Sequence, residues 1–221
     1  MMRILALLAS VALLGACSML PGGTSNSDKP RAGNAQSVAA TPAARQCLGK
    51  LNATGARFIA KADAYGGKGC SNINTVSLSA MRGDRSQFEV TNLGTVSCPV
   101  ANTFAAWTRF GVDRAARQIL GSPIERIETM GSYSCRNVAG SSRRSAHSTA
   151  DAVDVSAFVL KDGRRISLSG GWNSSDRRER EFLRVVHKSA CKRFGTVLGP
   201  DYNAAHRDHF HLERGDGSFC R

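Results

Sequence analysis

The spacing of apolar residues predicts helices in the first half of the chain. Between Pro99 and Gly121, large apolar side chains recur at the three- to four-residue spacing of a helix that buries one face. Ser97 is the expected N-cap, Pro99 suits the first turn, and Gly121 ends the segment. Thr41 and Pro42 predict the start of an earlier helix. The apolar positions on the longer helix are Phe104, Trp107, Phe110, Ala115 and Ile119.

The second half mixes strand and helix patterns. Residues 152–160 predict a strand, Asp162-Gly163 a turn and residues 165–168 the partner strand of a hairpin. Helical spacing returns over residues 176–193. Shorter strands are expected at 124–130, 196–198 and 209–213. The sequence therefore predicts an α+β fold, in which helices flank a small mixed or antiparallel sheet.

The predicted strands separate polar from apolar side chains. Successive strand residues point to opposite faces, so Asp154 lies opposite Val153 and Val155, which suit a core. By the same rule His209, His211 and Glu213 share one face, and Phe210 and Leu212 share the other. We therefore expect the imidazoles and the Asp154 carboxylate to line a cleft.

These polar positions have the composition of a zinc site. His147 stands seven residues before Asp154 in SAHSTADAVD, and the later segment HRDHFH carries His206, Asp208, His209 and His211. Two imidazoles and a carboxylate can hold Zn²⁺ and leave one position for water. The sequence thus predicts a hydrolytic zinc site. The fifth histidine, His187, lies on the predicted helix without acidic or histidine neighbours, and is interpreted as structural.

The N-terminus predicts export and lipid anchoring. Residues 1–17 carry one cation, Arg3, and an apolar run too short to span a bilayer as a mature helix. The stretch LGAC resembles a lipobox, in which Cys17 becomes the lipid-bearing N-terminus. Ser18 then favours the outer membrane, facing the periplasm, by resemblance to bacterial sorting rules. An ordinary cleaved signal with a coincidental cysteine is the alternative.

The rest of the chain divides into a tether and one domain. Residues 18–44 are rich in Ser, Gly, Pro, Thr, Ala and Asn and predict a flexible tether. Residues 45–221 are long enough for one packed domain. An exported domain with six cysteines is expected to form up to three disulfides, but counting leaves all fifteen pairings open.

The chain is strongly basic, with a formal charge of +13, or +12 once Arg3 leaves with the signal. In an exported protein this charge favours anionic envelope polymers or lipid headgroups as partners over nucleic acid. A merely solvated basic surface is the alternative.

Two families share motifs with this chain. SAHSTADAVD is similar to the SxHxxGxAxD motif of the LAS or M15 zinc peptidases, which cleave peptidoglycan peptides containing D-amino acids, and HRDHFH resembles their second motif. SYSCRN, KDGRR and ACKRFGTVLGPDYNAAHRDHFHLE resemble the bacterial extensin-like C-terminal domain family more closely. This likeness spans about Cys47 to Cys220. The likeness to the peptidases implies a hedgehog- or DD-peptidase-like fold, with peptidoglycan stem or cross-link peptides as partners.

The peptidase resemblance also implies individual roles. His147, Asp154 and His211 become the zinc ligands, and Asp208 the candidate general base. Arg136 matches an arginine that lies near the substrate, where it can stabilise an oxyanion.

Three positions leave alternatives open. His206 and His209 are candidates to bind the intermediate, orient a ligand or replace Asp208 as base, with His206 favoured as accessory. Ala150 stands where the motif has glycine, so a required positive φ would force a different local backbone.

The function also has alternatives. A non-catalytic wall-binding or scaffold protein that retains the metal cleft competes with the hydrolase, and a cluster of hydrogen-bonded His and Asp without metal is a third possibility.

Overall fold

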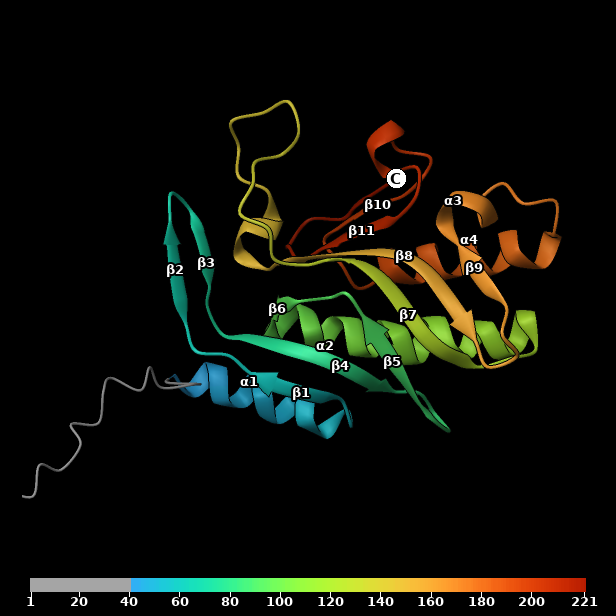
Figure 1. Ribbon diagram of the computed structural model, residues 1–221, viewed down its shortest axis with the longest axis horizontal. Coiled ribbons are helices and arrows are strands. Elements are labelled where there is room, and N and C mark those ends of the chain that lie inside the picture. The colour runs from blue at the N-terminus through green and yellow to red at the C-terminus, as the bar shows by residue number, and fades with distance from the viewer. Residues whose placement is uncertain (1–40) are drawn as a thin grey trace, which may run out of the picture. The chain divides into compact units, whose positions relative to one another are not determined.

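Strand β8 (Ala152–Leu160) lies in the middle of the main sheet (Figure 1). The computed structural model describes residues 41–221, and in it β8 pairs with β7 (Ile124–Gly131) on one side and β11 (Phe210–Glu213) on the other. Almost every residue of β8 is buried, as its β-branched and aromatic composition favours. The signal segment, Cys17 and residues 18–40 of the expected tether lie outside the described residues. The tether does not extend to residue 44 as expected, because a helix begins at Pro42.

The main sheet of the described residues has ten strands and is mixed. Its order is β1-β4-β5-β7-β8-β11-β10-β12, with β6 on β4 and β9 on β8, and only β5–β7 and β10–β12 are parallel pairs. The remaining strands are β1 (Arg57–Ala60), β4 (Thr75–Arg82), β5 (Gln87–Thr91), β6 (Thr95–Ser97), β9 (Arg165–Ser167), β10 (Thr196–Leu198) and β12 (Phe219–Cys220). A separate hairpin joins β2 (Ala64–Gly67) and β3 (Cys70–Asn72). The mixed α+β class is confirmed, but the sheet is larger than the small one expected.

Sequence signals correctly mark the start of α1 and the end of the second helical segment. Thr41 caps α1 by accepting a hydrogen bond from the Ala44 amide at 3.1 Å, and Gly121 ends the second helical segment with φ of 76°. No described helix is long and apolar enough to cross a membrane. The helices are α1 (Pro42–Ala53), α2 (Cys98–Trp107) with its π-helical continuations η1 (Thr108–Asp113) and η2 (Ala116–Leu120), η3 (Ala146–Thr149), α3 (Leu168–Gly171), α4 (Arg177–Cys191) and η4 (Ala204–His206).

The expected N-cap position of Ser97 is confirmed, but its side chain has another partner. Ser97 stands at the N-cap position of α2, but its hydroxyl makes no capping hydrogen bond. It donates instead to the Asp151 carboxylate at 2.7 Å, which ties the start of α2 to the segment between His147 and Asp154. The side chain therefore links the helix to the site region.

A β-bulge in β8 allows both ends of the strand to contribute to the core. Between the pairs Glu128–Ala157 and Thr129–Val155, one step along β7 opposes two steps along β8, so Ser156 is the extra residue. The alternation of faces shifts at this residue. The side chains of β8 in the apolar core are therefore Val153, Val155, Phe158 and Leu160, two before the bulge and two after it.

Phe158 joins the sheet to two helices. Its ring packs edge-on against Trp107 of α2, with centroids 6.2 Å apart, and against Phe182 of α4 at 5.3 Å. All three side chains are fully buried.

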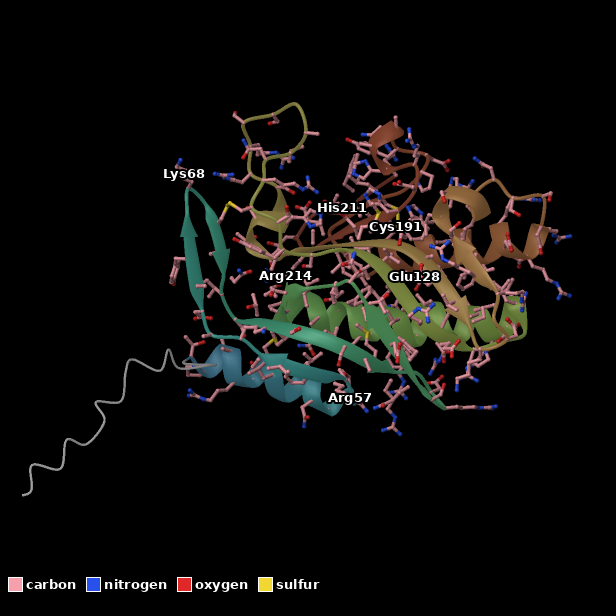
Figure 2. The ribbon with its side chains drawn as sticks, viewed as in Figure 1. Arg57, Lys68, Glu128, Cys191, His211 and Arg214 are labelled. Atoms are coloured by element: carbon pink, nitrogen blue, oxygen red, sulfur yellow. A yellow bond between two sulfur atoms is a disulfide. The ribbon has the colours of Figure 1, made fainter. Side chains whose placement is uncertain are left out.

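Three disulfides connect elements that are distant in sequence, as the cysteine count allowed. Cys47–Cys98 links α1 to α2, Cys191–Cys220 links the end of α4 to β12, and Cys70–Cys135 links β3 to the loop that follows β7 (Figure 2).

We predict that Phe158→Ala lowers the free energy of unfolding by about 3–5 kcal/mol, because a buried aromatic ring leaves a cavity between sheet and helices. Urea unfolding followed by circular dichroism measures this loss. Phe110→Ala is the control: its ring is 44% exposed, so a change below about 1 kcal/mol is expected. Equal losses in the two variants would contradict the assignment of the core.

Candidate metal centre

The three residues expected as ligands come from two paired strands and a short helical turn. Asp154 on β8 is directly opposite His211 on β11 in an antiparallel register, so both side chains point to the same face. His147 lies in η3, whose first turn is held by the Ser145 hydroxyl, an acceptor for the His147 amide at 3.3 Å. The structure therefore brings together residues that are up to 64 positions apart.

Their polar atoms converge on one point. Asp154 Oδ1 is 2.9 Å from His211 Nδ1, Asp154 Oδ2 is 3.1 Å from His147 Nε2, and the two nitrogens are 3.2 Å apart. All three residues are buried, with exposed fractions of 8%, 8% and 2% for Asp154, His211 and His147. A cluster this close and this buried excludes bulk water from between its members.

Each imidazole is oriented by a second hydrogen bond on its outer side. His147 Nδ1 donates to the Ser132 carbonyl at 2.5 Å, and His211 Nε2 donates to Glu213 Oε2 at 3.2 Å. Since a neutral imidazole carries one N–H, these bonds leave lone pairs on His147 Nε2 and His211 Nδ1. Outer partners of this kind fix the tautomer and orientation of metal-binding histidines.

The lone pairs of His147 Nε2 and His211 Nδ1 and the Asp154 carboxylate repel one another unless a proton or a metal cation lies between them. In the metal-free chain a proton on His211 meets this need: burial opposes the charge, but hydrogen bonds to Asp154 and Glu213 raise the pKa of His211 to about 9. Burial likewise opposes ionisation of Asp154, yet the two histidines hold its pKa well below its usual value. The cluster is therefore built to carry positive charge at its centre.

The donor set fits a zinc ion. Ligand atoms about 2.0–2.1 Å from a tetrahedral metal are roughly 3.3 Å apart, close to the separations of 2.9–3.2 Å seen here. Among the described residues, His147, Asp154 and His211 would supply three ligands, so a tetrahedral zinc would keep a fourth position open.

A second group of metal-type residues does not qualify. The side chains of His187, Cys191 and Cys220 are close together, but the two cysteines form a disulfide and offer no thiolate. The His187 ring packs against Phe210 and Trp172, and burial lowers its pKa. These contacts agree with the structural interpretation of His187.

The centre opens into a cleft of about 910 Å³. One wall is the loop after β7 with η3, and the other is formed by β10, η4 and β11. Figure 2 shows His211 between these two parts of the molecule. Arg136, His206 and His209 line this cleft together with Asp154 and His211.

Asp208 lies behind His209 rather than in the cleft wall. Asp208 Oδ1 accepts a hydrogen bond from His209 Nδ1 at 2.9 Å, and Asp208 is not among the residues that line the cleft. The opposite nitrogen, His209 Nε2, is 3.8 Å from Asp154 Oδ1. His209 therefore presents its Nε2 to the centre, while Asp208 holds the opposite nitrogen of the same ring.

His206 forms the outer edge of the histidine cluster. Its ring centroid is 5.2 Å from that of His209 and 5.9 Å from that of His211, and Asn203 Oδ1 contacts its Nδ1 at 2.7 Å. Partial burial, together with charge on His209 and His211, lowers the pKa of His206 to about 4. The neutral ring is positioned for an accessory role.

Ala150 keeps a left-handed backbone without glycine. Its φ is 58°, and its amide donates to the His147 carbonyl at 3.1 Å. The expected departure of the local backbone is therefore not seen, and the turn carries the steric strain of a left-handed alanine. The Ala150 carbonyl accepts from the Ser97 amide at 2.9 Å, which helps hold this conformation.

Two groups that orient the ligands are not among the residues expected at the site. Strand alternation places Glu213 on the same face as His211, but it assigns Glu213 no role. Ser132 acts through its backbone carbonyl, which leaves no signal in a sequence.

A comparison with protein-family profiles gives a match over nearly all of the described residues. The profile of the extensin-like protein C-terminus matches residues 45–221. The chain belongs to this family. No curated protein and no solved structure matches. The match to this extensin-like domain itself assigns no metal-binding or catalytic residue.

We predict that Glu213→Ala weakens zinc binding by about 10–100-fold, because His211 loses the carboxylate that orients it. Competition with a chromophoric chelator measures the dissociation constant. Glu181→Ala, at an exposed position on α4, serves as the control and should bind zinc like the unchanged chain. An unchanged affinity in Glu213→Ala would show that this contact has no part in metal binding.

Zinc affinity should also rise with pH. The raised pKa of His211, about 9, means that the metal-free ring is protonated at pH 7, and zinc must displace that proton. Between pH 6 and 8 the dissociation constant should fall by roughly tenfold per unit, since one proton competes with the metal. Calorimetry in buffers of different ionisation enthalpy should show about one proton released per zinc. Binding without proton release would contradict this protonation state.

Proposed function

We propose that this chain is a zinc-dependent hydrolase of the cell envelope that cleaves peptidoglycan stem or cross-link peptides. The observation that carries the proposal is the convergence of His147, Asp154 and His211, with fixed imidazole tautomers, at the bottom of an open cleft. The resemblance of SAHSTADAVD and HRDHFH to LAS or M15 peptidase motifs gives the substrate class.

The location follows from the proposed signal. A lipid on Cys17 would hold the domain at the outer membrane, facing the periplasm, and the proposed tether between Ser18 and the start of α1 would let it reach the wall. The three disulfides support an oxidising compartment.

The proposed chemistry divides among the residues of the cleft. His147, Asp154 and His211 hold the metal, which when bound supplies Lewis acidity for amide hydrolysis. His209 Nε2 accepts the proton of the attacking water, while Asp208 holds Nδ1–H so that Nε2 is the free acceptor. The proton then passes from Nε2 to the nitrogen of the leaving amine as the C–N bond breaks.

An arginine on the opposite wall of the cleft stabilises the negative charge that develops on the carbonyl oxygen. Arg136 lines the cleft and stabilises the developing oxyanion. His206, neutral near pH 7, offers a further hydrogen bond at the edge of the histidine cluster.

The full chain loaded with zinc should release soluble peptides from purified peptidoglycan, detected by chromatography and mass spectrometry. A chelator should abolish release and added zinc restore it. His209→Ala should lower the rate by about 10²–10⁴-fold with zinc content unchanged, because a general base contributes that much. Asp208→Ala should lose less, since it only orients the base.

The variants separate the alternatives. His187→Ala removes an imidazole outside the centre and should retain activity. A larger loss in Asp208→Ala than in His209→Ala would transfer the role of base to Asp208. A chain that binds both zinc and peptidoglycan but releases no peptide would be a non-catalytic wall-binding protein, and the hydrolase proposal would be wrong.

A further inference from the structure

One rim of the cleft carries arginines without acidic partners. Arg136, Arg143 and Arg144 all line it, and none forms an ion pair with a carboxylate among residues 41–221. Elsewhere many arginines are neutralised, as when Arg109 and Arg114 share Asp84. Positive charge is therefore left unpaired where a ligand would enter.

The loop that carries these arginines is ordered. The Ser145 amide donates to the Arg136 carbonyl at 3.2 Å and the Val138 amide to the Arg143 carbonyl at 2.9 Å, so the loop closes as a hairpin. Its base is held by the Cys70–Cys135 disulfide. Loss of conformational entropy on ligand binding is therefore smaller than for a free loop.

Arg144 is also packed against the neighbouring β2–β3 hairpin. A methyl group built on Gly69 would lie 3.3 Å from Arg144 Cγ and 3.4 Å from its Nε. Because Gly69 has no side chain, it leaves room for the aliphatic stem of Arg144. Arg144 is half-buried by this packing and also lines the cleft.

The acidic side chains inside the cleft do not neutralise the positive charge of the arginines on this rim. Asp154 contacts His147 and His211, and Glu213 contacts His211. Both carboxylates are therefore engaged by imidazoles at the bottom of the cleft, and the arginine rim remains available to an anion from outside.

We infer that Arg143 and Arg144 form a subsite that binds a carboxylate of a peptide substrate away from the bond to be cut. Arginine suits this task because its planar guanidinium pairs with a carboxylate through two parallel hydrogen bonds. The substrate class of the proposed hydrolase is accordingly narrowed to acidic peptides. This inference rests on the proposed function for the identity of the ligand, but not for the binding itself.

The test compares two arginine pairs of identical sequence. R143Q/R144Q changes the rim, and R177Q/R178Q removes the same charge from exposed residues on the first turn of α4. Fluorescence anisotropy of the full chain, in chelator and again in zinc, measures binding of two labelled tetrapeptides. One contains two glutamates and a free carboxyl terminus, and the other contains glutamines and an amide.

R143Q/R144Q should bind the acidic peptide about three- to tenfold more weakly, the range expected for two partly exposed ion pairs. The difference should shrink in high salt. R177Q/R178Q should bind like the unchanged chain, and the amide peptide should not distinguish the three proteins. Thermal melting checks that both variants are folded.

Three results would overturn the inference. These are unchanged binding in R143Q/R144Q, an equal loss in both double variants, or tighter binding of a polyphosphate of matched charge than of the acidic peptide. Because binding is also measured in chelator, it does not depend on zinc or catalysis. If the chain binds the acidic peptide through Arg143 and Arg144 but does not hydrolyse peptidoglycan, the proposed function is refuted and the subsite is not. If it hydrolyses peptidoglycan but R143Q/R144Q binds the acidic peptide unchanged, the subsite is refuted and the proposed function is not.

Discussion

The antiparallel pairing of β8 with β11 sets the positions of Asp154 and His211, two of the three residues of the candidate metal centre. In this register Asp154 is opposite His211, and the apolar neighbours Val155 and Phe210 are paired on the other face. A slip of one residue would turn the Asp154 carboxylate into the core and the valines into the cleft, at a cost of several kcal/mol. The core therefore fixes the register, and the site takes its geometry from the core.

The same pairing makes a buried carboxylate tolerable. Asp154 is only 8% exposed, and an unpartnered charge at that depth would be strongly unfavourable. His147 and His211 contact its two oxygens, and Ser132 and Glu213 in turn hold the outer nitrogens of those rings. Each polar group is thus satisfied by the next, out to the edge of the cleft. Replacing an outer residue such as Glu213 would therefore disturb the three central residues, although Glu213 is not itself one of them.

The sequence predicted the face of each strand residue at the centre, because alternation along a strand needs only local information. Asp154 between two core valines, and His211 beside Phe210, are examples. It did not predict the strands between Arg57 and Ser97, where the apolar pattern is short and interrupted by glycines. Nor did it show the bulge at Ser156, which depends on pairing with a distant strand. Asp208 was favoured as base by motif spacing, whereas its contact with His209 depends on side-chain rotamers.

The described residues form a large apolar core and three disulfides, and these features bear on what a metal would do here. A proton on His211 satisfies the cluster when zinc is absent, and a disulfide between residues 51 positions apart, Cys47 and Cys98, restrains the unfolded chain. Domains that need zinc to fold have small cores and closed, four-ligand sites. Here a large apolar core accompanies three ligands and an open cleft. A metal held by three side chains at the bottom of a cleft would be accessible to a ligand, and this supports the proposal of a chemical rather than a structural role.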